Sequence, residues 1–126
     1  ADVEIPSIHP IHVDQANETL FLNTKNRIAA LMSKKAGIVR SAENLNLALK
    51  ELQEIKQSLP EEIIEYNLLK IKHIADICSL ICESALIRKE SRGGHIREDY
   101  PGERQAFCAH LIQQKDQEYK FQEIRK

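Results

Sequence analysis

The sequence predicts an all-α protein, an antiparallel three-helix bundle of the spectrin-repeat kind with an irregular C-terminal tail that can include a short strand or hairpin. Three observations lead to this prediction: one long amphipathic stripe, a second stretch dense in apolar residues, and proline or glycine at the boundaries between them. Of the 126 residues, 42% are hydrophobic and 29% are charged, which suits one folded core and not a disordered segment. The net charge of −1 gives no global field that would favour nucleic acid or an anionic membrane.

The first helix is predicted to follow a lead-in segment. Two prolines restrict the backbone of residues 1–13, which we therefore expect to be a strand or a linker. Asp14 is the expected N-cap of a helix that runs to about Ala36. Gly37 follows two lysines, whose charges suit a helix C-terminus, and is expected to form a left-handed cap.

The second helix has the clearest pattern in the chain. Ser41 is a good N-cap residue, and apolar residues then recur at three- and four-residue steps. The stripe consists of Leu45, Ala48, Leu49, Leu52, Ile55 and Leu59. We expect an amphipathic helix with one buried face, and we expect Leu52 to be buried.

The third helix is predicted to start near Leu59 and to run to about Arg92. Ser58 and Glu61 fit a capping box, with proline in the first turn. Apolar residues then surround more than one face of the helix, and we expect Ile81 among them to be buried. A helix of this kind must be covered on two sides, by its two partners and by something outside the chain.

The pattern changes after the third helix. Residues 93–126 are predicted to form a charged loop, a short helix over residues 104–113, and a tail in which alternating Tyr119, Phe121 and Glu123 indicate a short strand. The predicted organisation is therefore a lead-in over residues 1–13, a bundle over residues 14–92 and this final segment.

Residues that could perform chemistry are sparse. Cys78 and Cys82 share a helix face with His73 and could hold a metal, but buried small hydrophobic residues are the favoured interpretation because no second ligand pair exists. His9 and His12 are expected to be solvated residues of a linker. Four glycines supply neither a dinucleotide fingerprint nor a P-loop. We therefore predict no catalytic, cofactor-binding or metal-binding residue, and three cysteines without a disulfide framework favour a cytoplasmic setting.

Residues 88–101 concentrate arginines, carboxylates and a histidine around the expected end of the third helix. One interpretation is a helix C-terminus with basic residues near the helix dipole, a glycine cap and a solvated loop. The other interpretation is an interface that meets another polar domain, because fixed charges of both signs lie beside a glycine cap. The residue pattern alone leaves both interpretations open.

The same segment, RKESRGGHIREDYP, closely resembles the RxESRGxHxRxDxP signature in the helical domain of the succinate dehydrogenase, fumarate reductase and L-aspartate oxidase flavoproteins. AGIVRSAENLNLALKELQEI resembles the family segment where the first helix passes into the second, and NLLKIKHIADICSLICESALIRKESRG resembles its long third helix. The resemblance covers residues from about 28 to 112 in the family's order. The connection between the second and third helices is short, at residues 59–62, and in this it is similar to the L-aspartate oxidase branch. The C-terminal tail, with FCAHLIQ and EYKFQEI, resembles instead the ending of the dehydrogenases.

The resemblance implies the C-terminal helical domain of an FAD-dependent oxidoreductase, most like the L-aspartate oxidases, which convert L-aspartate to iminoaspartate for NAD biosynthesis. It implies that FAD is bound by the parent enzyme and not by this chain, which would be a docking domain without activity. Residues 1–13 would link it to an upstream flavin domain. The alternatives are the same domain of a succinate dehydrogenase or fumarate reductase flavoprotein subunit, and a free-standing helical interaction module.

The partners that the resemblance implies are the flavin-binding and capping domains of the same polypeptide, without nucleic acid or membrane insertion. Together with the residue pattern, it favours a docking role for the charged segment, with Arg92 as its main contact and Glu90 and Asp99 as local partners. The residues assigned to this docking surface are Arg88, Glu90, Ser91, Arg92, Gly93, His95, Arg97, Asp99 and Tyr100.

Overall fold

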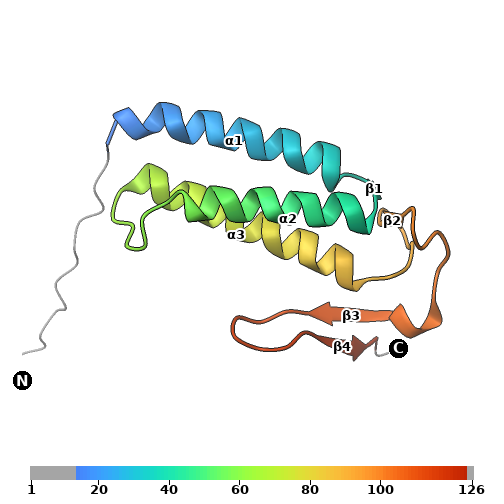
Figure 1. The fold of residues 1–126 in the computed structure, drawn as a ribbon. Coiled ribbons are helices and arrows are strands. Elements are labelled where there is room, and N and C mark those ends of the chain that lie inside the picture. The colour runs from blue at the N-terminus through green and yellow to red at the C-terminus, as the bar shows by residue number, and fades with distance from the viewer. Residues whose placement is uncertain (1–13, 125–126) are drawn as a thin grey trace, which may run out of the picture.

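The computed structural model describes residues 14–124, in which three α-helices carry a short strand between the first two and further short strands after the third (Figure 1). Helix α1 spans Ala16–Lys35, α2 spans Ala42–Gln57 and α3 spans Tyr66–Ile87. The colours in Figure 1 run in one direction along α1 and α3 and in the other along α2, so the chain reverses at each helix connection. The three predicted helices are confirmed, while the predicted lead-in at residues 1–13 lies outside the described residues. None of the described helices is long and apolar enough to cross a membrane.

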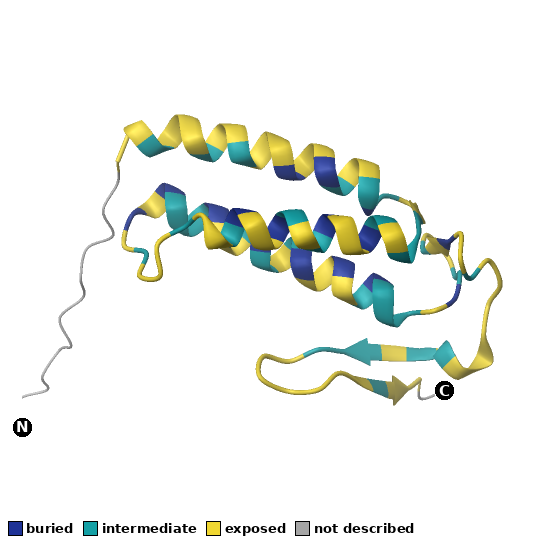
Figure 2. Cartoon of the chain, in the orientation of Figure 1, coloured by how far each residue is buried: buried dark blue, intermediate teal, exposed yellow. Residues whose placement is uncertain are grey.

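The core lies where the three helices meet (Figure 2). Leu45, Ala48 and Leu52 of α2 have no exposed surface, as the stripe in the sequence predicts. Buried residues of α3 recur at similar three- and four-residue steps, so one face of that helix packs on α1 and α2. The buried apolar set is Ile28, Leu31, Ala36, Leu45, Ala48, Leu52, Ile55, Ile71, Ala75, Cys82 and Ala85.

The start of α3 differs from the prediction. Ser58 is the C-cap residue of α2, where its hydroxyl donates to the carbonyl of Ile55 at 2.6 Å, and it does not cap the start of α3. Glu65 caps α3 instead, accepting from the amide of Leu68 at 2.8 Å. The same carboxylate accepts from the amide of Asp14 at 2.9 Å, which ties the start of α1 to the start of α3. The hydrogen bond between Glu65 and Asp14 favours Glu65 as the N-cap of α3 over the predicted capping box of Ser58 and Glu61.

Both predicted glycine caps are also wrong. Gly37 is not left-handed; an added Cβ would lie 2.7 Å from the carbonyl oxygen of Ser33, so the close approach of the chain to α1 requires glycine. Helix α3 ends at Ile87, not near Arg92, and its last carbonyls bind a guanidinium described below. Gly93 does adopt a positive φ of 58°, but in a turn beyond the helix.

The tail contains more strand than the sequence predicts. A short 3-10 turn spans Gln105–Phe107, and the remainder of the predicted helix is replaced by strand β3, Ala109–Ile112. Strand β3 pairs antiparallel with β4, Lys120–Glu123, which confirms a strand near the C-terminus. Leu111 lies opposite Phe121 in this hairpin, so pairing buries apolar surface that an isolated helical turn would leave exposed.

A second, two-residue ladder holds the charged segment against the bundle. Strand β1, Val39–Arg40, lies between α1 and α2 and pairs in parallel with β2, Ile96–Arg97. The pair places the segment that follows α3 beside the connection between the first two helices.

Ile81 is exposed, against the prediction that it is buried. Its side chain is 43% exposed, and its neighbours Ile77 and Leu80 are 59% and 49% exposed. These three residues lie on α3 away from the face that packs on the other helices. Within the described residues, nothing fully covers this second apolar face of α3, and it remains on the surface.

We expect Leu52→Ala to destabilise the purified chain by about 2–5 kcal/mol, because it removes a fully buried side chain and leaves a cavity. Leu47→Ala on the same helix is the matched control, since Leu47 is 46% exposed and its truncation should change the free energy of unfolding by about 0.5 kcal/mol or less. Urea denaturation followed by circular dichroism measures both. Equal losses would contradict the assignment of the core.

Candidate functional site

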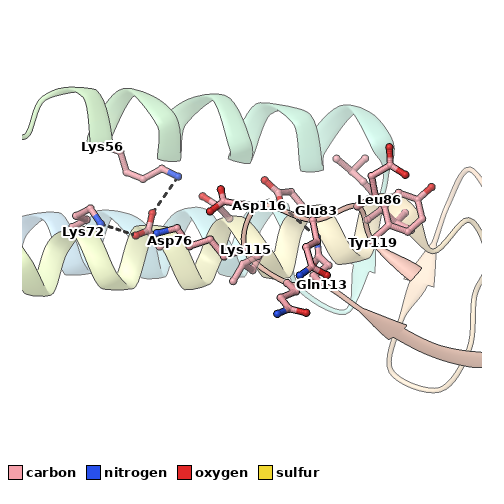
Figure 3. A pocket seen from close by; sticks show the side chains of 15 residues that line it. Lys56, Lys72, Asp76, Glu83, Leu86, Gln113, Lys115, Asp116 and Tyr119 are labelled. Atoms are coloured by element: carbon pink, nitrogen blue, oxygen red, sulfur yellow. Dashed lines mark hydrogen bonds and ion pairs between the residues drawn. The ribbon is translucent and has the colours of Figure 1, made fainter. Parts of the chain in front are cut away.

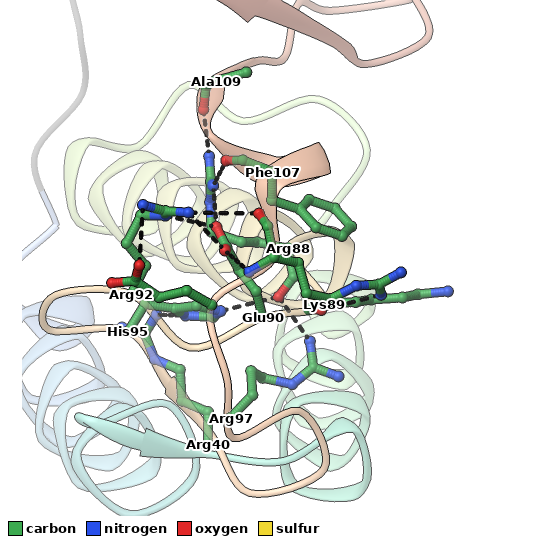
Figure 4. Close-up of polar contacts among 11 residues, drawn as sticks. Arg40, Arg88, Lys89, Glu90, Arg92, His95, Arg97, Phe107 and Ala109 are labelled. Carbon is green, nitrogen blue, oxygen red and sulfur yellow. Dashed lines mark hydrogen bonds and ion pairs between the residues drawn. The ribbon is translucent and has the colours of Figure 1, made fainter.

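The buried carboxylate of Glu90 organises the segment that follows α3 (Figure 4). Its two oxygens accept from Arg88 at 2.7 Å, from Arg92 at 3.1 and 3.2 Å, and from the amide of Arg104 at 2.9 Å. Burial by itself raises the pKa of Glu90, but the hydrogen bonds from Arg92, Arg104 and Arg88 outweigh it and hold the pKa at about 2. Glu90 is therefore an anion at neutral pH that joins three arginine positions.

Arg97 is the other buried charge of the segment, with 1% of its surface exposed. Its Nη1 donates to the carbonyls of Ala85 at 2.7 Å and Leu86 at 3.1 Å, in the last turn of α3. The guanidinium thus caps the negative end of that helix dipole. Its Nε and Nη2 form a two-pronged pair with Asp99 at 2.8 and 2.7 Å.

Asp99 extends this link to a second helix. Its Oδ2 accepts from the amide of Ala42, in the first turn of α2, at 3.2 Å. The hydrogen bonds from Arg97, which outweigh the effect of partial burial, lower the pKa of Asp99 to about 2. One ion pair therefore joins the C-terminus of α3 to the N-terminus of α2, and each charge has the sign that its helix end favours.

His95 lies between two arginines. Its Nδ1 is 2.8 Å from Nη1 of Arg40, and its Nε2 is 3.0 Å from the carbonyl oxygen of Arg88. Because arginine can only donate, Nδ1 must be the acceptor and Nε2 carries the proton in the neutral ring. Burial and the positive charges of Arg40, Arg97 and Arg88 lower the pKa of His95, although its bond to the Arg88 carbonyl acts in the other direction. The ring is thus suited to hold two segments together in its neutral form.

Ser91 and the glycine pair shape the backbone of the segment. The Ser91 hydroxyl accepts from the amide of Arg97 at 2.8 Å and lies 2.7 Å from the carbonyl oxygen of Tyr100. Arg92 and His95 exchange backbone hydrogen bonds at 2.8 and 3.0 Å, which closes a tight turn over Gly93. The Ser91 hydroxyl and the backbone groups of Arg92 and His95 therefore form hydrogen bonds within the chain.

The structure brings together all the residues assigned to the docking surface, but it pairs some of them differently from the prediction. Arg92 contacts Glu90 as predicted, whereas Asp99 pairs with Arg97. Arg40 was not assigned to the site, although it lies in the AGIVRS stretch that carries part of the family resemblance. Its contact with His95 joins residues far apart in sequence, which no local pattern reveals.

Neither the N-terminus of α2 nor that of α3 is open to the pyrophosphate of a dinucleotide. A dinucleotide needs a glycine-rich turn that leaves a helix N-terminus open to the pyrophosphate. Here the N-termini of α2 and α3 are bound by the chain's own Asp99 and Glu65. The network of charged residues that follows α3 can hold segments of the chain in position. Because hydrogen bonds keep the carboxylates of Glu90 and Asp99 ionised, these groups are poorly suited to transfer protons near neutral pH.

The cysteines on α3 belong to the packing of that helix. Cys82 is fully buried, its sulfur lies 3.8 Å from that of Met32, and burial raises the pKa of its thiol to about 11. No group of three or more metal-ligating side chains occurs among residues 14–124. Cys78 and Cys82 therefore have the environment of core residues and not of reactive thiolates.

A hollow lies between α3 and the turn of the β3–β4 hairpin (Figure 3). Its wall carries charges of both signs. Lys56 and Lys72 each lie 3.4 Å from Asp76, and Gln113 reaches Glu83 at 3.5 Å. Since these lysines already have a carboxylate partner, this hollow indicates no particular ligand.

The stability of the chain should fall steeply in acid. The pKa values of Glu90 and Asp99, about 2 in the folded chain, lie below their ordinary values of 4.5 and 3.8, so their stabilising contribution is present above those values and is lost as the pH falls towards 2. We expect Glu90→Gln to lower the melting temperature near pH 7 and to flatten its dependence on pH between about pH 5 and 2.5.

Calorimetry over this pH range measures the effect, with Glu98→Gln as the matched control because the side chain of Glu98 is exposed. A Glu90→Gln profile that stays parallel to that of the wild type would show that the Glu90 carboxylate does not carry the acid sensitivity.

Comparison with known proteins gives the family of this chain. A family model described as the fumarate reductase flavoprotein C-terminus matches residues 25–125. L-Aspartate oxidase of Synechocystis sp. is 32% identical to this chain in an alignment that covers 84% of the chain and 24% of that enzyme's length. A fumarate reductase flavoprotein subunit of Helicobacter pylori is also 32% identical, over 61% of the chain and 12% of its own length.

The fold has a counterpart in a solved structure of an E. coli quinol fumarate reductase FrdA variant. The two structures superpose with a TM-score of 0.66 and 19% identity, over 82% of this chain and 21% of the other. The chain thus spans about a quarter or less of the length of these proteins. Since the family model covers most of the sequence, this chain belongs to the family of fumarate reductase flavoprotein C-terminal domains.

Proposed function

We propose that this chain is the C-terminal helical domain of an L-aspartate oxidase, an FAD-dependent enzyme that converts L-aspartate to iminoaspartate in de novo NAD biosynthesis. The observation that carries the proposal is the extent of the match. The L-aspartate oxidase of Synechocystis aligns with 84% of the chain, compared with 61% for the fumarate reductase subunit of H. pylori. The short connection between α2 and α3 also supports this branch of the family.

In this proposal the domain is structural and the chemistry takes place elsewhere in the polypeptide. The flavin-binding domain holds FAD, and residues 1–13 link it to the helices, which form an antiparallel bundle of the spectrin-repeat kind. The carboxylates that occupy the N-termini of α2 and α3 support this division of labour. The parent enzyme is proposed to be cytoplasmic and to act without nucleic acid or membrane insertion.

The segment from Arg88 to Tyr100 is proposed to dock on the flavin-binding and capping domains of the same polypeptide. Glu90 and Arg97 are buried within the chain, so their part in docking would be to hold the shape of the segment. Arg92 has a side chain that is 33% exposed beside Glu103 and is the proposed direct contact. The polar network would thus fix the segment before it meets its partner, which reduces the entropic cost of docking.

The second candidate is the same domain of a succinate dehydrogenase or fumarate reductase flavoprotein subunit. The observation that favours it is the likeness in fold to the quinol fumarate reductase chain, which extends over 82% of this chain. The two candidates share the flavin and differ in the substrate.

The full-length flavoprotein tests the proposal directly. Under anaerobic conditions L-aspartate should bleach the absorbance of the bound FAD, whereas succinate should not. The 126-residue chain alone should bind no FAD, because it has no glycine-rich turn for the pyrophosphate. Bleaching by succinate and not by L-aspartate would transfer the assignment to the dehydrogenase branch.

A further inference from the structure

An open groove runs between the outer face of α3 and the β3–β4 hairpin. One wall is apolar and is formed by Ile77, Leu80 and Ile81 of α3, with Leu111 of β3 opposite them. The three residues of α3 are between 43% and 59% exposed in the described chain. Side chains of this size gathered on one helix face are typical of a surface that another segment covers.

Two arginines and two histidines gather at the end of the groove nearest the charged segment, and one of the histidines, His95, is held in its neutral form. That end is lined by Arg40, Arg88, His95 and His110, and no carboxylate lines the groove within the described residues. Arg88 is paired with Glu90, which does not line the groove, so within residues 14–124 the positive charge of the groove that has no ion pair is that of Arg40. A partner that fits the groove must therefore present apolar surface with a negative group beside it.

Arg40 is the residue that indicates the negative group most directly. Its Nε donates to the carbonyl of Gly37 at 2.7 Å and its Nη1 to the ring of His95 at 2.8 Å, and both partners are neutral. Arg88 and Arg97 each contact a carboxylate within the chain, whereas no ion pair of Arg40 occurs among residues 14–124. A half-buried guanidinium in this setting retains its affinity for a carboxylate.

We propose that the groove binds a segment of the larger flavoprotein polypeptide in which an apolar side chain lies next to an Asp or Glu. The apolar side chain would cover Ile77 and Ile81, and the carboxylate would pair with Arg40. The length of the relatives supports this source, because about three quarters or more of each lies outside the region that this chain matches. The inference rests on the proposed function only in placing the chain within such a polypeptide.

The apolar contact is tested in the full-length flavoprotein with Ile77→Gln and Leu47→Gln. Both residues are exposed on helices in this structure, at 59% and 46%, and Leu47 does not line the groove. A covered groove predicts that Ile77→Gln lowers the melting temperature by about 2 °C or more, while Leu47→Gln changes it by less than about 1 °C. Equal shifts for the two variants would overturn the proposal.

The carboxylate is tested with Arg40→Lys and Arg40→Gln in the same protein. If Arg40 served only its neutral partners, glutamine would be tolerated at least as well as lysine, because it donates hydrogen bonds and relieves repulsion from Arg88 and Arg97. An acidic occupant predicts the opposite order, with lysine retaining more of the melting temperature. A melting temperature for Arg40→Gln that equals or exceeds that of Arg40→Lys would exclude the carboxylate.

The outcome is independent of the substrate. A wild-type enzyme that oxidises succinate and not L-aspartate would contradict the proposed function while leaving the groove intact. Conversely, a true L-aspartate oxidase in which Ile77→Gln behaves like Leu47→Gln would contradict the groove alone.

Discussion

The ion pair between Arg97 and Asp99 is the interaction on which the arrangement of the chain after the bundle depends. Arg97 binds the last carbonyls of α3, and Asp99 binds the first amide of α2. A helix C-terminus and a helix N-terminus carry partial charges of opposite sign, so one cation and one anion that also bind each other satisfy both ends. The pair is placed by the two-residue ladder between β1 and β2, and the β1 connection contributes Arg40 to the same cluster.

At the opposite end of the bundle, the single carboxylate of Glu65 joins two helices. Glu65 accepts from the amides of Leu68 and Asp14, and so joins the starts of α1 and α3. The buried side chain of Asn67 supports the same point by donating to the carbonyl of Asp14 at 3.1 Å. Polar groups at the two ends of the bundle thus fix the relation of the helices, while the apolar stripe supplies burial.

The charged groups of the segment that follows α3 are occupied by hydrogen bonds within the chain. Glu90 accepts four hydrogen bonds, and Arg97 is occupied by carbonyls and by Asp99. Groups that are held in this way keep one protonation state and one direction. They hold the segment that follows α3 in one shape.

The sequence predicts the features that depend on neighbouring residues. Ser41 and the stripe that contains Leu52 lie within one helix, and both predictions are confirmed. The start of α3 could not be predicted, because Glu65 succeeds as a cap through a bond to Asp14, 51 positions earlier. The same holds for the link between Arg40 and His95, 55 positions apart.

The tail and the outer face of α3 show a second limit. The apolar residues at positions 107, 111 and 112 suit a helical turn as well as a strand, and pairing with β4 decides between them. The density of apolar residues in α3 indicates that the helix needs cover on two sides. It does not tell which residue stays exposed, and Ile81 was assigned to the wrong face.

A double-mutant cycle on Arg97→Ala and Asp99→Ala, measured by urea denaturation of the 126-residue chain, tests this account most directly. If the pair joins α3 to α2, the two substitutions should be coupled by about 1–3 kcal/mol, because each single change leaves the other charge without its partner. Losses that add to within about 0.3 kcal/mol would contradict the account and would reduce the pair to two independent helix caps.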